Sequence, residues 1–187
     1  MAVTTLDPKT ALIVIDLQNG IVAMAGADAV SEVIANAARL AEAFRSHGLP
    51  VVLVNVIPSA VPRRTEQVRS LPTLPEGWAD LVPQLNTQPT DHCITKHTWG
   101  AFSDTGLDGW LKAQGVTQVV MTGVSTSIGV DTTARQAFEA GFNVAFAIDA
   151  MKDMSDEAHA HSLTRIFPRI GETDTTQEIM VLLKRTA

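Results

Sequence analysis

The sequence predicts an α/β fold, a three-layer α-β-α sandwich with a mostly parallel, doubly wound sheet of about six strands. Apolar runs without polar alternation, such as residues 10–16, are typical of strands that are buried on both faces of a parallel sheet. Segments with helical periodicity lie between these runs and are long enough to serve as crossover connections. No internal repeat, low-complexity tract or linker interrupts the pattern, so residues 1–187 are expected to form a single domain.

The first half of the chain contains three expected strands and two expected helices. Residues 10–16 form the first strand, and residues 16–20 form a turn. Residues 28–46 form a helix because Val30, Val33, Ile34, Ala37 and Leu40 recur at helical spacing, and His47-Gly48 ends it. Pro50 leads into a buried strand at 51–57. Residues 58–75 hold four prolines and three arginines and are expected to be irregular. A short strand at 93–96 and a helix at 104–114, stopped by Gly115, follow.

The second half continues the alternation of strands and helices. Residues 118–122 form a strand, and a helix that contains Gly129 ends near Gly141, with its apolar face formed by Val130, Ala134, Ala137 and Phe138. Residues 144–148 form the next strand. Residues 155–166 form a helix that Ser155 caps at its N-terminus. Ile170 closes a short final strand, and residues 175–184 form the last helix.

The overall composition narrows the possible partners and locations. The 187 residues are 45% hydrophobic and 18% charged, with a formal net charge of -6. This acidic balance argues against nucleic acid or an anionic membrane as the main partner. No apolar run is long enough to span a bilayer, and the N-terminus does not have the pattern of a signal peptide, so we expect a cytoplasmic protein. The single cysteine excludes an internal disulfide.

Ligands of open parallel sheets bind beyond the carboxyl ends of the strands, which draws attention to Asp16. A carboxylate at the end of a buried strand enters the edge of the cleft, and partial burial should raise its pKa unless a cation balances it. Gln18 lies two residues further on and could share the cleft side as a substrate-binding residue. Asp16 could equally cap the turn at 16–20, and the residues alone do not separate these interpretations.

Lys96 ends the strand at 93–96 and could pair with Asp16, although a solvated lysine at a strand end is also common. Trp99 and Phe102 follow; they could line an apolar pocket or pack the loop, and core packing is the better interpretation for Phe102. Side chains alternate along a strand, so Cys93 faces away from the cleft if Lys96 faces it. We therefore expect Cys93 to be a buried structural cysteine rather than a nucleophile.

The turn after the strand at 118–122 has a glycine where a nucleophile would be expected. A strand, a tight turn and a helix push one residue into a pocket above a parallel sheet, and here that residue is Gly129. The hydroxyls of Ser125, Thr126 and Ser127 precede it; they are expected to cap the helix and bind substrate or water, because no histidine lies nearby in sequence.

The five histidines do not have the spacing of a metal site, and no P-loop is present, so no metal or nucleotide cofactor is expected. His159 and His161, for instance, would lie about 200° apart on a helix with ~100° per residue.

Three segments together resemble the isochorismatase-like hydrolase superfamily: Asp16-Leu-Gln, Lys96-His-Thr-Trp-Gly-Ala-Phe102, and Thr-Gly-Val before the turn that holds Gly129. The similarity runs from about Thr10 to Leu183 and includes the strand that ends in Asp149-Ala150. In most members the residue matching Gly129 is a cysteine, and the resemblance then implies an Asp-Lys-Cys triad that hydrolyses amides through a thioester. It also implies a homo-oligomer, a dimer or tetramer, that acts on a small molecule.

The isochorismatases proper also have glycine at this position, and they cleave a vinyl ether without an enzyme nucleophile. The resemblance then implies that Asp16 delivers a proton, that Lys96 tunes Asp16 or binds the anion of the substrate, and that Gly129 leaves space. Trp99 and Ser125 are expected to contact the substrate. This chain departs from those enzymes because it has no tyrosine, and Ser125 stands where they have one. Their substrate-binding arginine matches Arg63 or Arg64 only loosely.

Two alternatives to an acid-assisted hydrolase remain open. One is a non-catalytic binding protein on the same fold, and the other is an amidase that uses Ser125 or Ser127. The metal motif of nicotinamidases is absent from the segment after the second strand, which reads Asn55-Val-Ile-Pro-Ser59.

Overall fold

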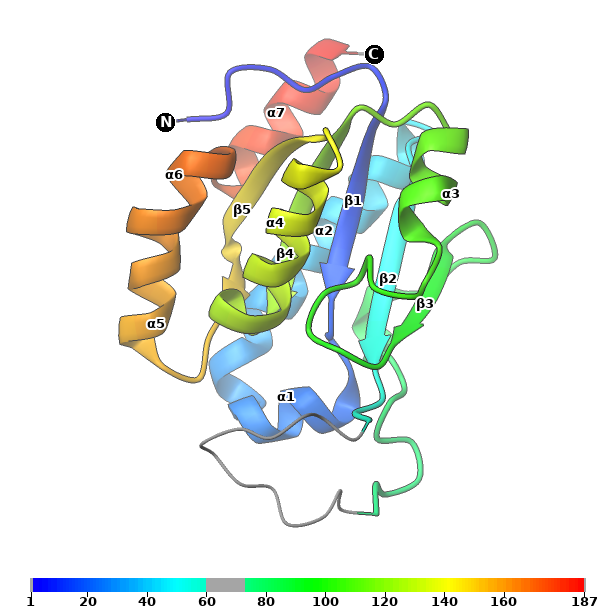
Figure 1. The fold of residues 1–187 in the computed structure, drawn as a ribbon, viewed down its shortest axis with the longest axis vertical. Helices are drawn as coiled ribbons and strands as arrows, with labels where there is room; N and C mark the ends of the chain where they lie inside the picture. The colour runs from blue at the N-terminus through cyan, green and yellow to red at the C-terminus, as the bar shows by residue number, and fades with distance from the viewer. Residues whose placement is uncertain (1, 60–72, 187) are drawn as a thin grey trace.

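The computed structural model describes residues 2–59 and 73–186, and the strands in these ranges form one parallel sheet of six, in the order β3-β2-β1-β4-β5-β6 (Figure 1). The strands are β1 (Thr10–Ile15), β2 (Val51–Val56), β3 (His92–Lys96), β4 (Gln118–Val124), β5 (Asn143–Lys152) and β6 (Glu172–Asp174). The chain builds outward from β1 on one side and from β4 on the other. The carboxyl ends of β1 and β4 therefore border the topological switch point, where open α/β sheets bind ligands.

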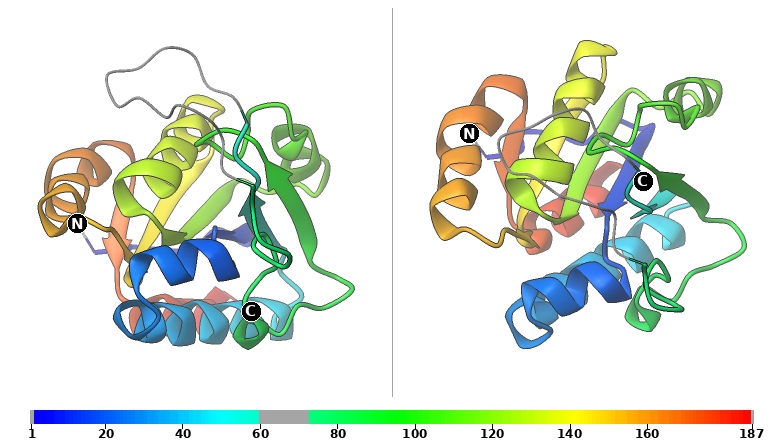
Figure 2. Two further views of the ribbon diagram at one scale, coloured as in Figure 1. Left: turned by 90° about the horizontal axis from the view of Figure 1, so that it is seen from below. Right: turned by 60° about the horizontal axis from the view of Figure 1, so that its bottom comes forward.

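Helices cover both faces of the sheet, as the sequence predicts (Figure 1, Figure 2). One face packs against α2 (Ser31–Ser46) and α7 (Thr176–Thr186). The other packs against α3 (Leu107–Ala113), α4 (Asp131–Glu139) and α6 (Phe167–Ile170). The remaining turns and helices are α1 (Asn19–Ala25), η1 (Asp28–Val30), η2 (Pro83–Leu85), η3 (Thr126–Val130), α5 (Asp156–His161) and η4 (Ser162–Ile166).

The central strand β1 shows why the apolar runs lack alternation. Leu12 and Val14 join the core on one face, whereas Ile13 and Ile15 join the core on the other, and all four are fully buried. A strand covered by helices on both faces has no solvent side on which to place polar residues. The α/β three-layer prediction is confirmed.

Several predicted boundaries differ from the structure. Helix α1 occupies part of the segment expected to be a turn. The helix expected at 28–46 begins as the 3-10 turn η1 and becomes α-helical at Ser31. Helix α3 starts three residues late because Gly106, with φ 75°, adopts a left-handed conformation before it. Strand β5 extends to Lys152.

The predicted final strand at Ile170 is wrong. The helix expected to stop at Ile166 continues through the π-turn η4 and α6 to Ile170, and the last strand is Glu172–Asp174. Pro168 is tolerated because it falls in the first turn of α6, where its missing N–H is not needed. The cap at Ser155 is confirmed, since its hydroxyl accepts a hydrogen bond from the Ala158 N–H at 3.2 Å.

Most of the irregular segment predicted at 58–75, including Arg63 and Arg64, lies outside the described residues. Among the described residues, no single helix is long and apolar enough to cross a membrane, although the bent pair Asn19–Ala25 and Asp28–Ser46 meets the length and composition test jointly.

Candidate active site

Asp16 begins the site at the carboxyl end of β1. Its backbone has φ 52°, a left-handed conformation that turns the chain sharply out of the sheet. Its N–H still donates to the Val54 carbonyl of β2 at 2.9 Å, which fixes the residue against the neighbouring strand. The side chain is buried, so a carboxyl group lies at the switch point with little access to water.

Lys96 reaches Asp16 from the end of β3. Its Nζ lies 2.8 Å from Asp16 Oδ2 and donates to the Trp99 carbonyl, also at 2.8 Å. The lysine side chain is only 2% exposed, so this is a buried ion pair rather than a solvated strand end. The sequence allowed Asp16 to be a turn cap and Lys96 to be a solvated strand end. The geometry favours the ion pair between them instead.

Gly129 lies in η3, directly after β4, and faces the same pair. A Cβ atom built on it would lie 3.2 Å from Asp16 Oδ2, 3.3 Å from Lys96 Nζ and 2.9 Å from Cγ2 of Ile15. The structure therefore brings the three predicted residues together. Gly129 is not among the residues with positive φ, so its backbone does not require glycine, and what a side chain there would change is the packing against Ile15, Asp16 and Lys96.

Burial dominates the electrostatics of Asp16. Desolvation raises the pKa of its carboxyl group from 3.8 to about 6, against the opposing effects of the charge and hydrogen bond of Lys96. The Oδ1 atom is buried and has no hydrogen-bond partner among the described residues. A carboxyl group with one engaged oxygen and one free oxygen can present a proton from the free oxygen.

The turn before Gly129 is held by a residue that the sequence analysis missed. Asp153, which follows β5, accepts hydrogen bonds from the N–H and the hydroxyl of Ser127, both at 2.7 Å, and from the Ser155 N–H at 3.1 Å. Burial opposes its ionisation, but these hydrogen bonds together lower the pKa of Asp153. Asp153 thus anchors the turn, and only the pairing of β5 with β4 brings it there.

A histidine also lies beside this turn, contrary to the expectation from sequence distance. His159 Nδ1 is 2.8 Å from the hydroxyl of Thr126, although the two residues are 33 positions apart. Burial, with a smaller contribution from Lys152, lowers the pKa of His159. The Ser125 side chain forms no cap hydrogen bond, so the predicted capping by this residue is wrong.

The loop after Lys96 is fastened to helix α4. The Ala101 N–H donates to Thr133 Oγ1 at 3.1 Å, and that hydroxyl donates to the Gly129 carbonyl at 2.7 Å. Trp99 itself is 56% exposed, and its carbonyl holds Lys96. Phe102 is half-buried against the core, as predicted.

Gln18 is fully buried and its amide is engaged with the backbone. Its Oε1 accepts from the Val56 N–H at 2.6 Å, and its Nε2 donates to the Val56 carbonyl at 3.0 Å. These contacts pin the end of β2 to the segment after β1. They explain a polar residue at this position without a substrate.

Cys93 is exposed, so the expected burial is wrong. The predicted direction is right, because Ile94 and Lys96 are buried while Cys93 and Thr95 are exposed. The error arises because β3 is the edge strand, and one of its faces is uncovered there. Partial desolvation of the thiol and the nearby charge of Asp91 raise the pKa of Cys93.

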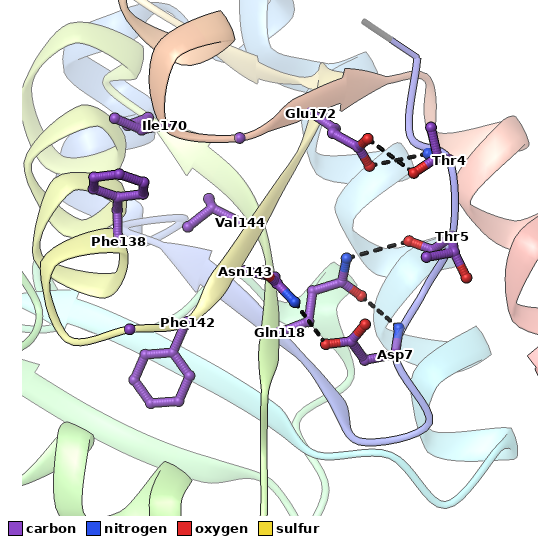
Figure 3. Close-up of a pocket in the computed structure, with 12 residues that line it drawn as sticks. Thr4, Thr5, Asp7, Gln118, Phe138, Phe142, Asn143, Val144, Ile170 and Glu172 are labelled. Carbon is purple, nitrogen blue, oxygen red and sulfur yellow. Dashed lines mark hydrogen bonds between the residues drawn. The ribbon is translucent and has the colours of Figure 1, made fainter.

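Two further features lie away from this site. Within the described ranges, no group of three or more His, Cys, Asp or Glu side chains could hold a metal ion. A cavity of about 490 Å³ lies at the amino ends of β4 and β5 (Figure 3), whereas Asp16 and Lys96 are at carboxyl ends. Its polar groups bond to one another: Glu172 accepts from Thr4, and Asp7 accepts from Asn143.

Comparison with known proteins places this chain among the isochorismatase-like hydrolases. Residues 10–178 match the Isochorismatase domain, so the chain belongs to the isochorismatase family. It is 40% identical over 182 residues to the uncharacterized isochorismatase family protein YwoC of Bacillus subtilis, covering 94% of this chain and 95% of that one.

Two solved structures illustrate the range of the likeness. An isochorismatase family protein from Burkholderia thailandensis is 40% identical, with a TM-score of 0.87 and coverage of 96% of this chain and 98% of that one. An N-carbamoylsarcosine amidase from Thermoplasma acidophilum is 26% identical, with a TM-score of 0.76 and coverage of 90% and 96%. The members of this family are hydrolases.

Proposed function

We propose that this protein hydrolyses a small anionic vinyl ether by acid-assisted addition of water, with Asp16 as the general acid. The observation that carries the proposal is the buried Asp16–Lys96 pair beside Gly129, with Oδ1 of Asp16 unpartnered among the described residues. A pKa of about 6 keeps part of the carboxyl population protonated near neutral pH, as a general acid requires.

The chemistry follows from the groups that are present. The proton of Asp16 forms a C–H bond with the electron pair of the vinylic double bond, which leaves an oxocarbenium ion. Water adds to that cation, and its proton returns to the Asp16 carboxylate. The resulting hemiketal collapses to a carbonyl compound and an alcohol. Lys96 holds the carboxyl group and attracts the anion of the substrate, and Gly129 leaves room for the substrate or water.

A second candidate is amide hydrolysis through a serine, which the amidase relative brings into consideration. Ser127 already donates its hydroxyl to Asp153, and its N–H is held by the same carboxylate. A hydroxyl that donates to a carboxylate gains basic assistance, but both contacts also fix the turn. In the first candidate, by contrast, the reacting oxygen, Asp16 Oδ1, has no hydrogen-bond partner among the described residues that it would have to give up. A third candidate, a protein that binds the same small molecules without turnover, predicts no reaction at all.

The test is a hydrolysis screen of anionic vinyl ethers, isochorismate among them, beside amides and esters. Asp16→Asn is expected to remove vinyl-ether turnover, because an amide cannot deliver the proton. Asp108→Asn is the matched control, since it breaks an exposed aspartate–lysine pair with Lys112 on α3. Undiminished turnover by Asp16→Asn contradicts the proposal, and turnover of amides alone by the unaltered protein favours the second candidate.

Gly129→Cys provides an independent arm of the same screen. The added Cβ requires Ile15 Cγ2 to move from 2.9 Å, and it then lies in contact with Asp16 and Lys96. If the variant acquires amidase activity while the unaltered protein has none, the glycine marks a change of chemistry on an intact scaffold. Amidase activity in both proteins would show that the missing side chain is not what selects the reaction.

A further inference from the structure

A cluster of basic side chains lies on the outer surface of the helices beside β5. Arg135 of α4 and His161, Arg165 and Arg169 of the α5–α6 segment line one cavity of about 500 Å³, together with Ile166 and Ile170. Figure 1 shows α4 and the α5–α6 segment side by side on the same face of the sheet. None of the candidate active-site residues lines this cavity.

The α5–α6 side of the cavity is a row of three basic side chains, of which the two arginines carry a permanent charge. His161, Arg165 and Arg169 are spaced by four residues along the continuous run of α5, η4 and α6, and all three are exposed. Residues four apart share a helix face, and the like charges of Arg165 and Arg169 at that spacing repel one another. No hydrogen bond or ion pair joins these three side chains to another described residue.

Arg135 faces this row from the neighbouring helix. Its Nε donates to Oδ1 of Asp131, which lies four positions earlier on α4. That contact engages one edge of the guanidinium and leaves its terminal nitrogens without a partner among the described residues. No carboxylate lines the cavity itself.

We infer that this cavity, lined by Arg135, His161, Arg165 and Arg169, binds a small ligand with several phosphate or carboxylate groups. Guanidinium groups match phosphate and carboxylate oxygens with paired hydrogen bonds, and three of the chain's 14 lysine and arginine residues gather here in a protein of net charge -6. A bound polyanion also relieves the repulsion within the row. The site is independent of the proposed hydrolysis.

The test is isothermal titration calorimetry with phosphate, pyrophosphate, tripolyphosphate and citrate at matched ionic strength. Affinity is expected to rise along the phosphate series, because each added group reaches another guanidinium. The double variant Arg165→Ala/Arg169→Ala should bind tripolyphosphate at least about tenfold more weakly, since hydrogen bonds to charged groups are among the stronger ones.

The matched control is Lys184→Ala/Arg185→Ala, which removes two exposed charges from α7 on the opposite face of the sheet. It is expected to change binding by no more than about twofold, because exposed charges beyond the Debye length are screened. Asp16→Asn should bind the anions unchanged, which separates this site from the proposed hydrolysis.

Three results would overturn the inference. The first is the absence of tripolyphosphate binding at millimolar concentration, and the second is an equal loss in the two double variants. The third is binding only to vesicles that contain anionic lipid, measured by co-sedimentation, which would make the cavity a membrane contact.

Discussion

The electrostatic role of Lys96 leads to a quantitative prediction about the acid. Burial raises the pKa of Asp16 from 3.8 to about 6 although Lys96 opposes this rise. Lys96→Met removes the positive charge while keeping an unbranched side chain in the buried position. An opposite charge at this range lowers a carboxyl pKa by about 1–3 units, so its removal should raise the pKa of Asp16 by a comparable amount.

The titration can be measured without a substrate. NMR of protein labelled with ¹³C at the aspartate carboxyl carbons follows each group through its pKa, and Asp16→Asn identifies the Asp16 signal. We expect a midpoint near 6 in the unaltered protein and a higher one in Lys96→Met. Lys112→Met is the control, because it breaks only the exposed pair with Asp108. A midpoint below about 4.5, near the ordinary range of aspartate, would refute the argument.

The same pKa predicts the pH dependence of turnover. With a pKa of about 6, about half of the carboxyl groups carry a proton at pH 6 and about 1% at pH 8, so kcat/KM should fall about 50-fold between them. In Lys96→Met the fall should begin at higher pH. A rate that rises with pH over this interval would mean that Asp16 acts as a base, which contradicts the proposed role.

The pH dependence of folding stability provides a separate check on the direction of the Asp16 pKa shift. The folded state holds the Asp16 proton more tightly than the unfolded chain, so stability is greatest below the unfolded pKa and decreases as pH rises toward about 6. A rise from 3.8 to about 6 corresponds to about 3 kcal/mol at about 1.36 kcal/mol per unit. Urea unfolding should therefore show the unaltered protein losing about 2 kcal/mol of this relative to Asp16→Asn from pH ~4 to pH ~7.

Three other changes test the surroundings of the site. Gly123→Ala should destabilise the protein by about 3 kcal/mol in urea unfolding, because φ is 116° and the new Cβ would lie 2.1 Å from a carbonyl oxygen of β1. The control is Gly109→Ala, where a Cβ meets nothing within 4 Å, and it should be neutral or stabilising. Asp153→Asn should cost about 1–3 kcal/mol at neutral pH by weakening the hold on Ser127. Because the folded pKa of Asp153 is lowered, the difference should shrink as pH falls through it; a constant difference contradicts this account. Cys93 should react with iodoacetamide in the folded protein, at a rate that rises about tenfold per pH unit near neutrality, without loss of turnover; protection from the reagent contradicts its exposure.

The sequence predicted the fold and the juxtaposition of Asp16, Lys96 and Gly129 because both depend on local pattern and chain order. Buried strands show as apolar runs, and their carboxyl ends meet at one edge, so Asp16 and Lys96 could be expected to approach each other. Strand order does not show in the sequence. It decides that Cys93 lies on an uncovered edge strand and that Asp153 reaches the turn before Gly129.

Side-chain partners were the least predictable feature. Gln18 has the position expected of a ligand-binding residue, yet both ends of its amide bond to the backbone of Val56. The contact of Thr126 with His159 joins residues 33 positions apart, so their distance in the sequence does not indicate that they meet. Such contacts depend on how helices pack over the sheet, which periodicity does not specify.

The unfavourable features at Asp16 support the proposal that this residue serves chemistry rather than folding. A buried ion pair is weak support for stability, because desolvating both charges offsets their attraction, and apolar residues of similar volume often serve as well. Asp16 adds a left-handed backbone conformation, with φ 52°, and a buried carboxyl oxygen without a partner among the described residues. Unpartnered polar atoms and unusual backbone conformations gather at functional sites, where the surrounding fold holds them in place. All three features occur at Asp16. Its carboxyl group faces Gly129, the one residue of η3 without a side chain. A purely structural Asp16 would leave that coincidence without a physical cause.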